Sequence, residues 1–139
     1  MATINAQITL SSADIADNVL SISNSATLTT AGTDTGLSEF TGLARKKTNT
    51  GSNTVLLDSG AGEAADVTAD KSAKVYIKNV NDRGDGTKFV TILLTAVEIG
   101  RLYGGDWMFI PWAGGSGKDI EFTASDTTET TLEYCVFYE

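Results

Sequence analysis

The 139-residue sequence contains no histidine, one cysteine and one proline. Without histidine, the chain lacks the usual general base, the commonest metal ligand and the central member of a Ser-His-Asp triad. Cys135 cannot form a disulfide within the chain, and its place in the apolar run 132–138 predicts a small core residue. We therefore expect no enzymatic activity, no metal site and no cofactor.

Long apolar runs and an excess of basic residues are also missing. No stretch approaches the roughly 18 consecutive apolar residues of a membrane-spanning helix, and no apolar segment follows a basic start, so we expect no signal peptide. Ten basic against eighteen acidic residues give a net charge of −8. This charge disfavours contact with phosphate backbones and anionic membranes, so we expect neither nucleic acid nor membrane as a partner.

Threonine, serine and glycine are abundant, and this composition favours strands and turns over helices. Apolar and polar residues alternate at 4–10 and 20–28, which predicts half-buried outer strands. The more apolar second half contains six further strand candidates. The candidate strands lie at 4–10, 20–28, 54–58, 73–80, 88–96, 97–103, 106–112, 119–124 and 130–138. The segment 60–71 is predicted to be a loop with at most one helical turn.

About ten short strands at this spacing predict an all-β fold, an antiparallel β-sandwich of jelly-roll type, with a plain barrel as the alternative. No repeat or boundary divides the chain, so residues 1–139 are predicted to form one domain, with segment 1–10 reaching toward neighbouring molecules. The Gly104-Gly105 pair predicts a two-residue hairpin turn, and NDRGDGT at 81–87 has the Asp-Gly chemistry of a hairpin loop.

Several short motifs resemble binding sites without meeting their requirements. GGSGKD at 114–119 lacks the first glycine and the hydroxyl residue of a phosphate-binding loop, and NVNDRGDG misses the ligand spacing of a calcium loop. Arg83, Gly84 and Asp85 spell the adhesion tripeptide RGD, which we interpret as a chance match in an exposed turn. The basic run Arg45, Lys46 and Lys47 is too short for a nucleic-acid patch but suits an acidic surface on a protein partner.

The stretch LYGGDWMFIPW at 102–112 holds both tryptophans and the only proline. Residues 107–112 are apolar without interruption, so both faces of this strand need cover. Three interpretations stay open: a core strand, a core strand whose second face forms a subunit interface, and a ligand platform. A similar two-sided strand at 89–94 favours the interface over a free ligand site. The candidate interface residues are Tyr103, Trp107, Phe109 and Trp112.

The order of VYIKN at 75–79, EIGRLYGGDWMFIPW at 98–112, ATLTTAGTDTGLSEFTGLARKK at 26–47 and TLEYCVFYE at 131–139 resembles small virion structural proteins of tailed bacteriophages. The resemblance implies a decoration or cement protein, made in the host cytoplasm, that binds the outer surface of the head. Its implied partners are the major capsid protein and two further copies in a homotrimer. Ile4 in the N-terminal segment, with Arg45, Lys46 and Lys47, would contact the capsid.

Two alternatives remain open. The chain could belong to the neck, tail, fibre or knob of the virion, although a long fibre would show repeats or a coiled coil that this sequence lacks. It could also be a receptor- or carbohydrate-binding module that uses its tryptophans as a platform.

Overall fold

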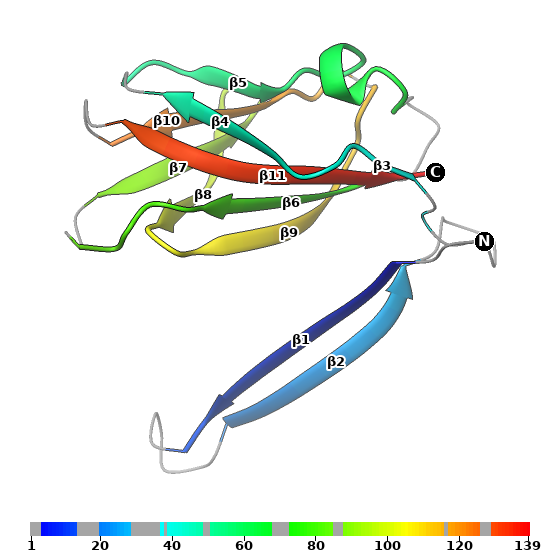
Figure 1. The fold of residues 1–139 in the computed structure, drawn as a ribbon, viewed down its shortest axis with the longest axis vertical. Helices are drawn as coiled ribbons and strands as arrows, with labels where there is room; N and C mark the ends of the chain where they lie inside the picture. The colour runs from blue at the N-terminus through cyan, green and yellow to red at the C-terminus, as the bar shows by residue number, and fades with distance from the viewer. Residues whose placement is uncertain are drawn as a thin grey trace. The chain divides into compact units, whose positions relative to one another are not determined.

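A computed structural model describes residues 4–13, 20–28, 37, 39–48, 51–67, 73–84, 88–115, 117–125 and 129–139 (Figure 1). By its internal contacts the chain forms two compact units, 1–38 and 39–139. The strands that were predicted at 4–10 and 20–28 belong to the first unit, and all the other predicted strands belong to the second.

The first unit contains a long antiparallel hairpin of β1 (Ile4–Ser12) and β2 (Leu20–Leu28). Nine consecutive residue pairs run from Ile4↔Leu28 to Ser12↔Leu20 without a bulge. The predicted strands and their alternation are therefore confirmed. The predicted half-burial is wrong for the centre of the hairpin, where Ile8 is 41 % and Leu10 48 % exposed. A two-stranded sheet is one layer, and alternation cannot bury a face that no second layer covers.

The second unit is a sandwich of two antiparallel sheets (Figure 1). One sheet has the order β5-β10-β7-β8 and the other the order β3-β11-β6-β9, with β4 also paired to β11. One short 3₁₀ turn, η1, lies where at most one helical turn was predicted. The elements are β3 (Glu39–Phe40), β4 (Ala44–Thr48), β5 (Thr54–Leu57), η1 (Gly62–Ala64), β6 (Ala73–Asn79), β7 (Phe89–Leu94), β8 (Val97–Tyr103), β9 (Trp107–Trp112), β10 (Ile120–Ala124) and β11 (Thr130–Tyr138).

The strands β3 and β4 act as one interrupted strand along the same edge of β11. Between them, the Thr41 amide donates to the Val136 carbonyl, and the Thr41 hydroxyl accepts from the Val136 amide. Counted this way, the described strands of the sandwich form two four-stranded sheets, and among them only β7 and β8 are consecutive in the chain and adjacent in one sheet. This is the connectivity of a jelly roll, so the predicted all-β, jelly-roll-like sandwich is confirmed.

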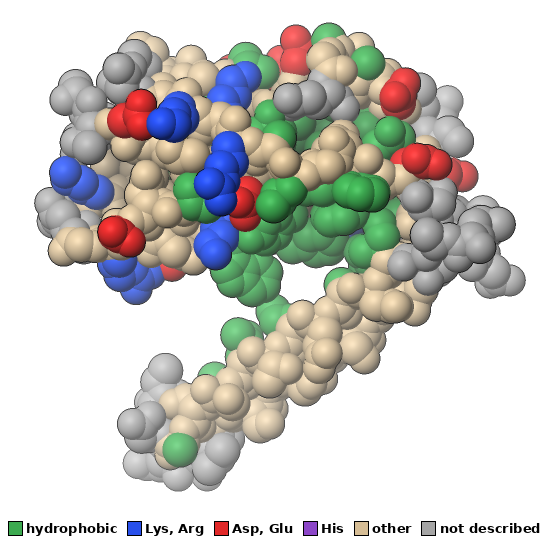
Figure 2. Space-filling view, viewed as in Figure 1, with side chains coloured by type: hydrophobic (Ala, Val, Ile, Leu, Met, Phe, Trp, Pro, Cys, Tyr) green, Lys and Arg blue, Asp and Glu red, His purple; other side chains and the backbone are tan. Residues whose placement is uncertain are grey.

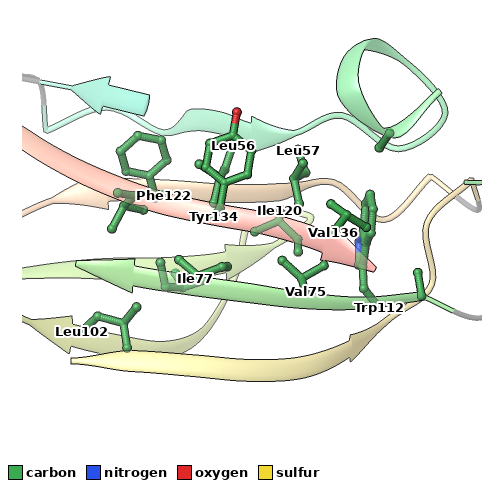
Figure 3. Packing of buried hydrophobic residues seen from close by; sticks show 14 of the residues in the cluster. Leu56, Leu57, Val75, Ile77, Leu102, Trp112, Ile120, Phe122, Tyr134 and Val136 are labelled. Atoms are coloured by element: carbon green, nitrogen blue, oxygen red, sulfur yellow. The ribbon is translucent and has the colours of Figure 1, made fainter. Parts of the chain in front are cut away.

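The core lies between the two sheets, where side chains of both layers point toward each other (Figure 3). Val75 and Ile77 on β6 alternate with half-buried Lys74, Tyr76 and Lys78, as expected for a strand with one buried face. The fully buried large side chains of this core are Leu57, Val67, Val75, Ile77, Val90, Ile92, Ile120, Phe122, Leu132 and Val136.

The two hairpins that the sequence predicted in the second unit are wrong. Strands β8 and β9 belong to different sheets, so Gly104 and Gly105 form a corner that carries the chain from one sheet to the other. The turn itself is present: the Asp106 amide donates to the Tyr103 carbonyl, and Gly105 has φ +85°. The loop after Asn79 likewise joins β6 to β7 across the sandwich.

The two glycines of this corner are needed for different reasons. Gly105 supplies the left-handed backbone conformation of the turn. Gly104 allows a close approach, because a Cβ atom there would lie 2.5 Å from the Asp82 carbonyl carbon. The preceding loop therefore packs directly on the corner.

The hairpin between β7 and β8 has a turn that the sequence did not reveal. Thr95 and Ala96 form it with φ of 50° and 64°, the region that glycine and asparagine usually occupy. Two hydrogen bonds hold the turn: the Thr95 amide donates to the Asp119 carbonyl, and the Ala96 amide donates to Glu121 Oε2, both at 2.9 Å.

Candidate functional site

The outer face of the sheet that contains β3, β11, β6 and β9 carries a row of aromatic side chains. Phe40 on β3 stacks on Phe137 of β11 with ring centroids 6.5 Å apart, and Phe137 meets the edge of Phe109 on β9 at 6.0 Å. Tyr76 of β6 stands between β9 and β11, paired in register with Phe109 and Cys135. Each aromatic contact contributes about 0.5 to 1.5 kcal/mol beyond area burial, so the row is an ordered surface.

Much of this row is open to solvent in the single chain. Phe40 is 63 % exposed and Trp107, at the start of β9, is 53 % exposed. Leu43, in the interruption between β3 and β4, is also exposed. Figure 2 shows hydrophobic side chains gathered on the face of the sandwich that carries β6, β9 and β11. We call the set Phe40, Tyr76, Trp107, Phe109 and Phe137 the aromatic face.

The four residues predicted as an oligomer interface do not share one surface. Trp107 and Phe109 belong to the aromatic face, but Trp112 is only 5 % exposed and lies in the core. Its indole Nε1 donates to the Lys118 carbonyl at 2.6 Å. Tyr103 lies on β8 in the other sheet, with its ring 5.5 Å from that of Phe89. Strand parity explains the first separation, since 107 and 109 point one way and 112 the other.

Two members of the aromatic face, Phe40 and Phe137, were not predicted from the sequence. Phe40 lies in a two-residue strand, and Phe137 alternates with core residues of β11. The one signal in the sequence was that position 137 points to the opposite face of its strand from position 136, and Val136 is buried. They meet because β3 pairs with the end of β11, a contact between residues about a hundred positions apart that no local pattern predicts.

The predicted capsid-contact residues are divided by the alternation of β4. Arg45 and Lys47 are exposed, whereas Lys46 is half-buried on the opposite side of the strand. Arg45 forms an ion pair with Glu133 at 2.9 Å, and Lys47 forms one with Glu129 at 2.7 Å. Both side chains of the Lys47–Glu129 pair are exposed, and such a pair contributes about 0 to 1 kcal/mol, so a partner could exchange it at low cost. In the Arg45–Glu133 pair, the Glu133 side chain is only 13 % exposed.

Ile4 opens β1 in the first unit, paired with Leu28, and the residues before it lie outside the described part of the chain. Of the RGD tripeptide, Arg83 forms an ion pair with Asp106 at the β8–β9 corner. Gly84 is described, and Asp85 lies outside the described residues. Arg83 is therefore engaged by its own chain.

Titratable groups on the aromatic face are perturbed by burial. Burial raises the pKa of the Tyr76 hydroxyl, and the Glu133 carboxylate adds to the increase. Burial also raises the pKa of the Cys135 thiol. Cys135 is buried as predicted, but it shares the face of Tyr76 and is not part of the core cluster between the two sheets. A protonated thiol is a poor nucleophile at neutral pH.

Among the described residues, no group of three or more His, Cys, Asp or Glu side chains is placed to hold a metal ion. No helix in the described ranges is long and apolar enough to span a membrane. What the aromatic face offers chemically is contact area: rings, aliphatic stems of Lys74 and Lys78, and paired charges around them.

No protein-family model fits the chain, and no curated protein matches it.

Proposed function

We propose that this chain is a structural protein of a bacteriophage virion, a decoration or cement protein that binds the major capsid protein on the outer surface of the head. The observation that carries the proposal is the aromatic face, which presents Phe40 and Trp107 largely to solvent on a rigid sheet. Exposed apolar patches of this kind mark protein interaction sites. The sequence resemblance supplies the kind of partner.

Cement function follows from multivalent contact. A jelly roll can bind one capsid subunit through one surface and a neighbouring molecule through another, so that several weak contacts act together. Aromatic residues such as Trp and Phe are enriched at the centres of such contacts. In this proposal the aromatic face makes the central contact, in a homotrimer or with the shell, and Arg45 and Lys47 lie at its rim.

The deciding experiment is cryo-electron microscopy of the phage particle that contains this chain. Density for the jelly roll on the head surface, at hundreds of copies, would support the proposal. Density confined to the neck, tail or a fibre would favour the other virion role, and no density on any particle would overturn both.

A binding assay with purified capsids tests the residues. Trp107→Ser together with Phe40→Ser should weaken capsid binding or trimer formation at least about ten-fold, because two large apolar side chains are lost. Val97→Ser is the matched control, since Val97 is also exposed but lies on β8 of the other sheet. Replacing Arg45, Lys46 and Lys47 together should reduce the binding only at low salt.

A carbohydrate-binding module is the second candidate, because exposed Trp107 and Phe40 on one sheet face could stack on sugar rings. It predicts glycan binding that is lost in Trp107→Ala, with folding and molecular mass unchanged. Glycan binding without capsid binding would favour this candidate.

A further inference from the structure

The β1–β2 hairpin has one apolar and one polar face. Because the register has no bulge, the alternating residues of both strands separate completely. The apolar face consists of Ile4, Ala6, Ile8, Leu10, Leu20, Ile22, Ala26 and Leu28, with Asn24 and Ser12 as its polar members. The opposite face consists of Asn5, Gln7, Thr9, Ser11, Ser21, Ser23, Ser25 and Thr27. Four large residues of the apolar face are exposed: Ile8, Leu10, Leu20 and Ile22.

The hairpin strands carry no charge. The chain has ten basic and eighteen acidic residues, yet none of them lies in β1 or β2. A contiguous exposed apolar patch on a protein usually marks a contact surface. The apolar face of this hairpin runs along the nine residue pairs without a charged side chain. An uncharged apolar face of this kind is typical of an element that packs against another surface.

The charge pattern identifies the occupant. Two copies of this chain each carry a net charge of −8 and repel one another, so a stable contact between them needs surfaces without charge. The hairpin is such a surface, whereas the outer faces of the sandwich carry Arg45, Lys74, Lys78, Arg101 and Glu133. A basic partner would gain no electrostatic attraction from an uncharged face.

We propose that the β1–β2 hairpin is a self-association element, whose apolar face packs against the same face of the hairpin in a second copy of this chain. Two copies of a face with the same alternation can pack on each other around a two-fold axis, and two sheets pack face to face about 10 Å apart. This inference rests on the proposed virion function and assigns to the hairpin a pairwise contact between copies, which is two-fold and therefore separate from any three-fold contact of a homotrimer. It leaves the aromatic face for the capsid protein.

The test measures self-association of the full chain by sedimentation velocity. Ile8→Thr should weaken association about ten-fold, and Ile8→Thr with Ile22→Thr about a hundred-fold, because each change removes apolar area from the contact. The control is Ile99→Thr: Ile99 is 42 % exposed on β8, nearly the same as Ile8, and carries the same substitution. It should leave association within two-fold.

Tryptophan fluorescence checks that the variants fold, since Trp107 and Trp112 both lie in the sandwich. Unchanged unfolding of the sandwich with reduced mass supports the proposal. A monomeric wild-type chain at about 100 μM would overturn it. So would equal effects of Ile8→Thr and Ile99→Thr, or a drop in sandwich stability in Ile8→Thr without any change of mass, which would indicate packing within one chain.

The result separates this inference from the proposed function. A monomeric chain that still binds capsids overturns self-association by the hairpin and leaves the virion function standing. A chain that associates through the hairpin and binds no particle overturns the virion function and leaves self-association by the hairpin standing.

Discussion

Strands β1 and β6 have the same alternating pattern and opposite surroundings. In β6, Val75 and Ile77 are fully buried, because a second sheet covers that face of the strand. In β1, Ile8 and Leu10 occupy equivalent alternating positions and are exposed in a two-stranded sheet. Alternation therefore predicts a strand and the direction of its side chains, but it does not predict what covers them.

The largest expected effect compares the same truncation in the two strands. Ile77→Ala should destabilise the sandwich by about 2 to 5 kcal/mol, because it leaves a cavity in a close-packed core. Ile8→Ala should cost less than about 0.5 kcal/mol in dilute solution, where its side chain is exposed. Urea denaturation measures both, followed by tryptophan fluorescence for the sandwich and by far-UV circular dichroism for the whole chain with its hairpin. Similar losses in the two variants would contradict the difference in burial.

The second comparison uses two asparagines. Asn79 at the end of β6 is buried: its Nδ2 donates to the Leu102 carbonyl at 3.0 Å, and its Oδ1 accepts from the Asn81 amide. Asn79→Ala should cost about 1 to 3 kcal/mol, since the Leu102 carbonyl would lose its buried partner. Asn24→Ala in the exposed hairpin should cost less than about 0.5 kcal/mol. Thermal unfolding compares the stability of the two variants. If Asn79→Ala also costs less than about 0.5 kcal/mol, water replaces the side-chain amide as the partner of the Leu102 carbonyl.

Asn79 also explains why the β8–β9 corner was mistaken for a hairpin. A Gly-Gly turn supplies the required φ values, but it does not decide whether the next strand pairs with the previous one or crosses to the other sheet. That choice is made by distant residues: Asn79 binds Leu102 through its side chain and Gly105 and Asp106 through its backbone. The fold class and most strands follow from local patterns, whereas strand pairing depends on such non-local contacts.

The aromatic face, like the fold, could be predicted from the sequence only in part. Parity within 107–112 separates outward Trp107 and Phe109 from inward Trp112, although the sequence grouped all three with Tyr103. Phe40 and Phe137 could not be added, because they join the surface only through the pairing of β3 with β11. A surface built from four strands is a property of the topology, and a single strand reveals only its own part of it.

The smallest expected effect concerns the turn of the β7–β8 hairpin. An L-residue in the left-handed region costs about 1 to 2 kcal/mol relative to glycine, and Ala96 has φ 64° with an exposed side chain. Glycine at this position relieves that cost but adds roughly 0.4 to 1 kcal/mol of freedom to the unfolded chain. Ala96→Gly should therefore stabilise the sandwich by about 0.5 kcal/mol.

The same substitution in a strand gives the control. Ala73 is buried in β6 and is outside the left-handed region, so Ala73→Gly should destabilise by at least about 0.5 to 1 kcal/mol. Opposite signs in urea denaturation would show that the turn stores strain, which the hydrogen bonds to Asp119 and Glu121 hold in place. Destabilisation by both variants would mean that these hydrogen bonds, and not the conformational preference of residue 96, determine the turn.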